Sequence, residues 1–259
     1  MARILIITPF RNEDHSISQY LESLCAVDYP KNLIDVYWLE NDSTDTTLNL
    51  LKAASSEMPF NSTELKSVKI LGPIKKMKPG RHAKDIGYGK HRVKSWLVIW
   101  NTYFLPLIRK AKSDYVLVWY ADSVVEPNIV KKFLKVFEDF KDVGWVSGAI
   151  YFRYPKHMHL AAPIPLDTKT NKPRLPCPPD STTPVKVKYS GHVWMCPREA
   201  LGKCVFARIG RDMHMSLILG LKKQGLYNYY DPTVFIKHIA TDGKIYTHKL
   251  RKESMKETY

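Results

Sequence analysis

The feature that most constrains the fold is an alternation of two residue patterns near the N-terminus. Residues 3–8 form a short β-branched run that Pro9 ends, and residues 16–26 then place apolar side chains at helical spacing. The same two patterns return at 33–39 and 47–55. Strands that alternate with helices require crossover connections, which favour a mostly parallel sheet flanked by helices. The pattern therefore predicts an α/β protein.

The rest of the chain extends this pattern. Further strands are expected at 68–71, 114–120, 143–152, 185–189, 191–195 and 229–238, and further helices at 95–111, 127–140 and 212–224. Residues 72–94 are dense in Lys, Arg, His and Gly and are expected to form a basic loop. Residues 155–184 contain eight prolines, and such a stretch inside a compact domain is typical of a functional loop.

The charge balance predicts an anionic partner. The chain has 40 Lys and Arg against 25 Asp and Glu, a formal net charge of +15. Nucleic acid, a nucleotide diphosphate and an acidic membrane surface all fit this charge. The aromatic cluster from Trp96 to Phe104 has the spacing of a core helix, and basic and aromatic residues do not alternate as in RNA-binding motifs. We therefore expect no nucleic-acid partner.

The spacing of the cysteines and the length of the apolar runs indicate the cellular compartment of the protein. The four cysteines include no C-x-x-C pair, so a zinc ribbon or thioredoxin-like site has no support, and the thiols are expected to be reduced. The apolar stretch at the N-terminus is too short for the core of a signal peptide, and no run approaches the length of a membrane span. These features predict a cytoplasmic protein.

Polar residues gather where the predicted strands end. Pro9-Phe-Arg-Asn-Glu13 follows the first strand, Glu40-Asn-Asp-Ser-Thr-Asp45 follows the second, and Asp122 follows the strand at 114–120. Open parallel sheets bind ligands at this edge. No G-x-G-x-x-G or Walker A sequence is present, which excludes ordinary dinucleotide and P-loop sites. The alternative interpretation of Asp42 or Ser43 is a cap for the following helix.

In this order the motifs resemble the GT-A glycosyltransferases, especially the family 2 group and its relatives. In that family a strand ending in P-x-x-N-E, a strand ending in D-(D/N)-x-S-x-D and a D-x-D motif form the nucleotide-sugar site. The resemblance covers about residues 3–238 and implies the following donor-binding residues: Pro9, Arg11, Asn12, Glu13, Glu40, Asp42, Arg92, Asn101, Ala121 and Asp122.

The resemblance also implies a metal site and a catalytic base. Asp122 and His238 match metal ligands of the family and would hold Mn²⁺ or Mg²⁺, while Asp212 matches its catalytic base. Ser190-Gly191 matches its acceptor-side segment. The alternatives are an ordinary strand-end histidine at 238 and a helix N-cap at 212.

Two positions depart from the family pattern. Tyr120 stands where the family has the first Asp of D-x-D, and Arg211 stands where it has a Glu before the base. Each motif keeps its main carboxylate, in Asp122 and Asp212. The departures leave metal affinity and acceptor preference open.

The implied function is a metal-dependent, inverting glycosyltransferase that moves a sugar from a nucleotide-diphosphate sugar, a GDP- or UDP-sugar, to a hydroxyl acceptor. Carbohydrate, lipid-linked and protein-linked acceptors all remain open. Residues 29–34 are similar to mannosyltransferases of this fold, which favours GDP-mannose. Basic side chains of the 75–92 loop would neutralise the departing phosphates.

The resemblance also divides the chain. We expect one GT-A domain over residues 1–243, with a nucleotide-sugar half at 1–152 and an acceptor half at 153–243 that includes the Pro-rich loop at 155–184. Residues 244–259 would form a basic tail. The charge of this tail suggests peripheral contact with an acidic membrane, and the alternative is that the charge serves solubility.

Three alternative functions remain. A nucleotidyltransferase of related fold would carry a Gly-rich, basic signature after the first strand, and residues 8–14 lack it. A nucleic-acid-binding protein is favoured by charge alone. A catalytically degenerate transferase is favoured by Tyr120.

Overall fold

The computed structural model describes residues 1–70, 94–151, 164–165, 182–189, 191–207, 214–240 and 242–245. The strands form one sheet in the order β3-β2-β1-β4-β9-β6-β10-β8-β7, with β5 paired to β10. Their bounds are β1 Ile4–Phe10, β2 Ile34–Asn41, β3 Ser62–Val68, β4 Tyr115–Val118, β5 Ser123–Val125, β6 Val143–Tyr151, β7 Ile164–Pro165, β8 Val185–Tyr189, β9 Trp194–Pro197 and β10 Tyr227–His238.

The first half of the sheet is parallel. β3, β2, β1 and β4 are neighbours that run in one direction, and β6 and β10 form a second parallel pair. β9 joins the two groups because it pairs antiparallel with both β4 and β6. The predicted α/β class with a central sheet flanked by helices is confirmed, although the sheet is mixed, because β5, β7, β8 and β9 pair antiparallel.

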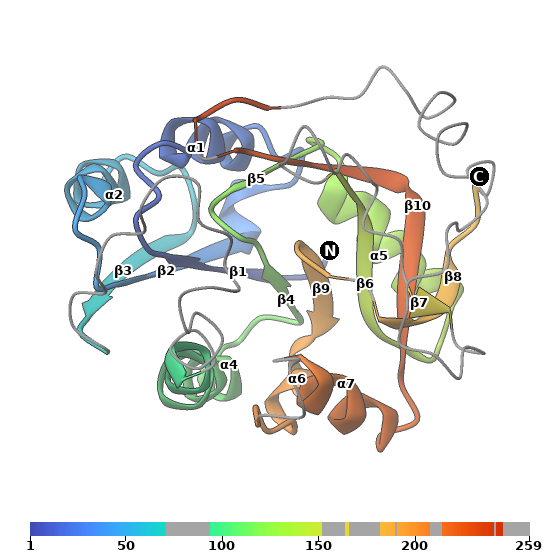
Figure 1. The fold of residues 1–259 in the computed structure, drawn as a ribbon. Helices are drawn as coiled ribbons and strands as arrows, with labels where there is room; N and C mark the ends of the chain where they lie inside the picture. The colour runs from blue at the N-terminus through green and yellow to red at the C-terminus, as the bar shows by residue number, and fades with distance from the viewer. Residues whose placement is uncertain are drawn as a thin grey trace, which may run out of the picture.

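Helices cover both faces of the sheet (Figure 1). Their bounds are α1 Ile17–Cys25, α2 Thr47–Ser55, α4 Leu105–Lys110, α5 Ile129–Asp139, α6 Arg198–Gly202 and α7 Met215–Lys222, with a 3₁₀ turn at Lys31–Leu33 and a π-helical segment at Ile99–Phe104. In Figure 1, α1, α2 and α5 lie on one side of the sheet, and α4, α6 and α7 lie on the other.

Each helix layer encloses its own part of the core. Ile17, Leu24 and Phe133 are buried against the first face, together with strand residues such as Trp38. Trp100 is buried against the second face, where its ring stacks on Trp194 at a centroid distance of 5.9 Å. Burial of large apolar side chains on both faces is the main favourable term for such a fold.

Some elements differ from the sequence-based expectation. The third strand was expected at 68–71 but lies at Ser62–Val68, because a mostly exposed edge strand needs no apolar run. β9 begins at Trp194 instead of Gly191, and β5 and α6 were not predicted. The helix expected at 95–111 is helical as predicted but includes the π-helical segment, a feature that propensity does not reveal.

Among the residues that the structure describes, no helix has the length and apolar content needed to cross a bilayer.

Candidate functional site

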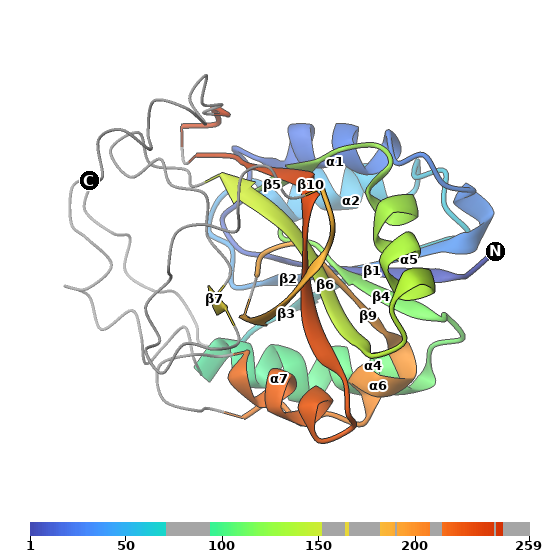
Figure 2. The ribbon, with the colours of Figure 1, turned by 90° about the vertical axis from the view of Figure 1, so that its right-hand side faces the viewer.

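Several of the predicted site residues lie at the carboxyl edge of the parallel strands. β2, β1 and β4 are adjacent and parallel, so the segments that leave their carboxyl ends emerge side by side. Those segments are the ones that begin at Arg11, Asp42 and Trp119. The sheet therefore brings three of the sequence motifs to one edge, as Figure 2 shows from the side.

The loops after β1 and β2 are bonded to each other. The Asn12 side chain accepts a hydrogen bond from the Thr44 amide at 2.7 Å, and the Asn12 amide donates to Ser43 Oγ at 3.1 Å. The Glu13 amide donates to Thr47 Oγ1 at 2.8 Å, at the start of α2. The two motifs therefore form one rigid, polar surface.

Asn12 and Asp42 both have left-handed backbones, each with φ of 52°. This conformation is unfavourable for residues with a Cβ, and side-chain hydrogen bonds help Asn and Asp to adopt it. The Asp42 carboxylate accepts from the Ile70 amide, with both oxygens at 3.1 Å. Asp42 and Ser43 thus bond to Ile70 and Asn12, and the interpretation that they cap α2 is wrong. Asp45 accepts from the Thr47 amide there instead.

Two of the predicted donor-binding acids bond within the scaffold. Glu40 is buried, and its carboxylate accepts from the Ser43 amide at 2.8 Å and from Ser67 Oγ. Glu13 accepts from Ser16 Oγ at 3.0 Å, just before α1. Both carboxylates shape the loops.

Asp122 and His238 are in direct contact. His238 Nε2 lies 2.8 Å from Asp122 Oδ2, and the two side chains are 5% and 16% exposed. β5 pairs with the end of β10 so that Ser123 lies opposite His238, and the Ile239 amide donates to the Asp122 carbonyl at 2.8 Å. Chain segments more than a hundred residues apart are thus locked together at this pair.

The pair fits part of a divalent-cation site. Ligand atoms about 2.1 Å from one ion and at right angles lie about 3 Å apart, close to the observed separation. Nδ1 of His238 is buried and has no hydrogen-bond partner among the described residues. In the described part of the chain no three His, Cys, Asp or Glu side chains gather as a metal site. Two protein ligands suit Mg²⁺-like ions, which commonly take substrate phosphates and waters as their other ligands.

Tyr120 makes contacts that a carboxylate would not make. Its hydroxyl lies 2.9 Å from His214 Nε2, just before α7, and its ring packs edge-on against Trp96 at 5.5 Å. Asn101, predicted to bind the donor, donates to the Phe206 carbonyl at 2.7 Å. Tyr120 thus ties the segment after β4, and Asn101 the π-helical segment, to the chain between α6 and α7.

The remaining predicted residues divide into two groups. Pro9 lies near the end of β1 and Arg11 in the loop after it, both partly buried, and Ala121 is buried beside Asp122. Arg92, Ser190 and Asp212 lie outside the described residues, as do the basic loop at 72–94 except residue 94, most of the 155–184 loop and most of the tail. The role of each of these predicted residues stays a prediction.

His192 is a site residue that the sequence did not indicate. Its ring centroid lies 5.1 Å from that of His238 and 5.9 Å from that of Tyr120. Its backbone is left-handed, with φ of 77°. The available signal was weak, because a histidine that follows Ser-Gly is common in loops of many kinds.

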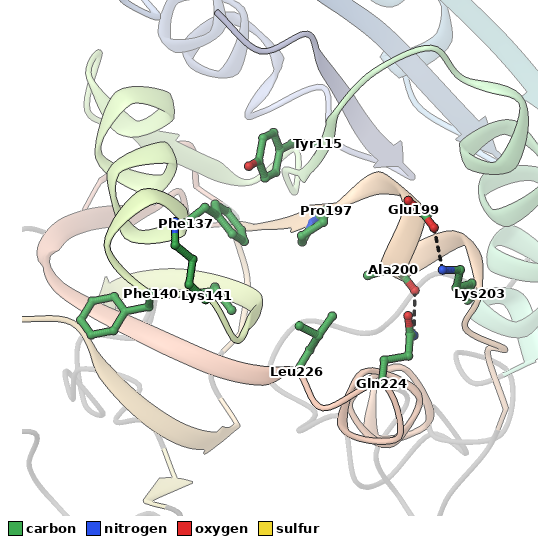
Figure 3. Close-up of a pocket in the computed structure, with 11 residues that line it drawn as sticks. Tyr115, Phe137, Phe140, Lys141, Pro197, Glu199, Ala200, Lys203, Gln224 and Leu226 are labelled. Atoms are coloured by element: carbon green, nitrogen blue, oxygen red, sulfur yellow. Dashed lines mark hydrogen bonds and ion pairs between the residues drawn. The ribbon is translucent and has the colours of Figure 1, made fainter.

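A separate pocket lies at the opposite edge of the sheet (Figure 3). It has a volume of about 500 Å³ and is lined by Tyr115 and Val143 at the amino ends of β4 and β6, among others. Its lining includes Phe137 and Phe140 but none of the predicted site residues. The chemistry of the strand-end loops, and not the size of this pocket, therefore locates the candidate site.

Comparison with known proteins bears on this arrangement. Residues 1–91 match the Anp1 family, a stretch that includes both strand-end loops. A mannosyltransferase from Pyrobaculum calidifontis, solved with GDP-Man and Mn²⁺, superposes with a TM-score of 0.56 at 18% identity, over 93% of this chain and 58% of its own. The fold is that of the GT-A glycosyltransferases.

A second GT-A structure agrees. Residues 1–349 of TarS from S. aureus, solved with UDP, give a TM-score of 0.54 at 14% identity. The match covers 89% of this chain and 60% of that TarS chain. This chain thus spans about three fifths of the GT-A structures that it matches. A comparison with curated protein sequences finds no match. The predicted resemblance to GT-A glycosyltransferases is confirmed, and the expectation of a glycosyltransferase agrees with both the family match and the fold.

Proposed function

We propose that the chain is a metal-dependent, inverting glycosyltransferase that uses a nucleotide-diphosphate sugar and a hydroxyl acceptor. The observation that carries the proposal is the buried contact between Asp122 and His238 at the carboxyl edge of a GT-A sheet. The buried His238 imidazole and the partly buried Asp122 carboxylate, in contact, form a donor set for a divalent cation. The loops joined through Asn12 and Thr44 supply polar groups for the nucleotide beside it.

The preferred donor in this proposal is a GDP-sugar, and GDP-mannose before others. Two observations support it: the N-terminal 91 residues match the Anp1 family, which is mannosyltransferase-like, and a structure of the same fold was solved with GDP-Man. UDP-sugars are the alternative, because the TarS structure of this fold holds UDP.

Each step of the reaction has a candidate residue. A bound cation would offset the negative charge that develops on the leaving diphosphate. Asp122 and His238 would hold and orient that ion. Asp212 would accept the proton of the acceptor hydroxyl as it attacks the anomeric carbon from the face opposite the leaving group, which inverts the configuration.

Nucleotide binding by the intact chain tests this function. The melting temperature is measured with GDP, UDP, CDP and dTDP, each with and without Mn²⁺, since a ligand that binds only the native state raises it. We expect a rise with GDP or UDP that requires Mn²⁺. The Asp122→Asn variant should lose the Mn²⁺-dependent part of the rise because it loses a carboxylate ligand.

A matched control separates this loss from a general effect of removing charge. Asp28→Asn removes an exposed carboxylate, 62% accessible, that pairs with Lys131 at the surface. This variant should keep the full nucleotide response. A nucleotide response that is equal with Mn²⁺ and with EDTA would overturn the metal-dependent mechanism. A response to sugar phosphate with nucleoside triphosphate would favour the nucleotidyltransferase alternative instead.

A further inference from the structure

The register of the sheet places His192 beside the Asp122–His238 pair. Val118 lies opposite Trp194 in the antiparallel pair of β4 and β9. Continued by two residues, this register brings residue 192 opposite residue 120, and the ring centroids of His192 and Tyr120 lie 5.9 Å apart. The imidazole thus stands at the carboxyl edge, partly exposed, with His238 on its other side at 5.1 Å.

The backbone at His192 indicates a constraint beyond packing. The described residues include three non-glycine residues with positive φ, namely Asn12, Asp42 and His192, and all three lie at the carboxyl edge. Strained residues tend to collect at functional sites, where the surrounding structure holds them in place. Asn12 and Asp42 belong to the two donor-binding motifs. His192 has the same conformation on the opposite side of Asp122.

The chemistry around His192 suits an anion. A cation held by Asp122 and His238 would carry the two phosphates of a nucleoside diphosphate within reach of a neighbouring side chain. An imidazole presents an N–H that can donate to a phosphate oxygen, and hydrogen bonds to charged groups are the stronger ones.

We propose that His192 donates a hydrogen bond to the terminal phosphate of the nucleoside diphosphate, on the side of the cation opposite the Asn12 and Asp42 loops. The inference rests on the proposed function, because it requires a nucleoside diphosphate at this edge. It assigns His192 a direct contact with the leaving group.

The experiment compares nucleoside diphosphates with monophosphates. The affinities of GDP, UDP, GMP and UMP are measured by calorimetry with Mn²⁺ for the wild-type chain and for His192→Gly. Glycine adopts a positive φ without strain, so the variant should fold, which its melting curve checks. We expect its affinity for the bound diphosphate to fall about 10-fold or more, the effect of one lost charged hydrogen bond. Its affinity for the monophosphate should stay within about 2-fold.

A second variant keeps the test sharp. Asn tolerates the left-handed backbone and retains an N–H donor, so His192→Asn should bind the diphosphate more tightly than His192→Gly. Unchanged diphosphate affinity in a folded His192→Gly variant would overturn the inference, and so would an equal loss for the monophosphate. Absence of nucleotide binding by the wild-type chain would instead overturn the proposed function, and this inference with it.

Discussion

Asp42 combines backbone strain with a hydrogen bond that stabilises it. Its φ is 52°, and its carboxylate accepts from the Ile70 amide just beyond β3. The bond links the carboxyl ends of β2 and β3 and holds the second donor loop in place. A single side chain therefore sets the backbone shape of the loop that is predicted to bind the nucleotide.

Two variants of this residue separate the effects. Asp42→Gly loses the hydrogen bond but relieves the strain, whereas Asp42→Ala loses the bond and keeps a Cβ in a left-handed backbone, at a cost of about 1–2 kcal/mol. Part of the advantage of glycine is offset, because glycine loses more conformational entropy than alanine when the chain folds. We expect Asp42→Ala to be less stable than Asp42→Gly by about 1 kcal/mol in urea denaturation. Equal or greater stability of the Ala variant would contradict a left-handed Asp42.

At the scale of elements, β6 and β10 form the pair that carries His238 to its place. Their parallel ladder has a register shift between Asp231 and Phe235, and Gly148 of β6 lies against Val234 there. A Cβ on Gly148 would meet both the side chain and the carbonyl oxygen of Val234 at 2.6 Å. Because one of these atoms is backbone, the strands must move apart to accept it.

Gly148→Ala is therefore expected to destabilise the chain by about 2 kcal/mol, the usual scale of overpacking in a core. The Mn²⁺-dependent nucleotide response should weaken as well, because β10 ends at His238. Gly202→Ala is the matched control, since its Cβ would lie 3.5 Å from Arg109 Cγ, an ordinary contact. If both variants unfold at the same urea concentration as the wild type, this result would contradict the close contact between Gly148 of β6 and Val234 of β10.

The success of prediction from sequence varied with the kind of element. α2 was predicted at its observed bounds, Thr47–Ser55, because a polar turn and an apolar stripe mark it locally. The third strand was predicted at the wrong residues because the exposed, polar residues of β3 form no apolar run. β5 was missed because three residues are too few for a periodic signal. Local patterns thus sufficed for elements that bury one face.

The individual residues of the candidate site were predicted better than the hydrogen bonds between them. The resemblance to the family paired Asp122 with His238, and the structure brings the two side chains into contact. The bonds between the Asn12 and Ser43 loops could not be predicted, because they depend on the tertiary positions of two strand ends. His192 was missed because nothing in the residues Gly191 and Val193 beside it indicates a positive φ.

At the scale of the whole molecule, the net charge of +15 predicts attraction to acidic surfaces. Each Lys or Arg near an acidic bilayer contributes about 1 kcal/mol, and the attraction decays within a Debye length. Six basic or histidine residues lie in the C-terminal tail: Lys244, His248, Lys249, Arg251, Lys252 and Lys256. We propose that this charge brings the chain to a membrane that carries its acceptor.

Sedimentation with vesicles tests this proposal. We expect the chain to pellet with vesicles that contain phosphatidylserine and to stay in the supernatant with neutral vesicles. Salt at about 0.5 M should release it because exposed charges are then screened. Removal of residues 244–259 should reduce the bound fraction. Equal recovery in the supernatant with both kinds of vesicle at low salt would leave a soluble acceptor.

The place of β10 has a consequence for synthesis of the chain. β10 is the last strand among the described residues, yet it lies between β6 and β8 and also pairs with β5. A growing chain on the ribosome therefore holds β6 with an open edge until residues 227–238 emerge, and open edges invite pairing with other chains. Any product that stops before residue 238 lacks both an inner strand and one member of the Asp122–His238 pair. Truncated chains should therefore be prone to aggregation, and the Asp122–His238 pair can form only after synthesis has passed His238.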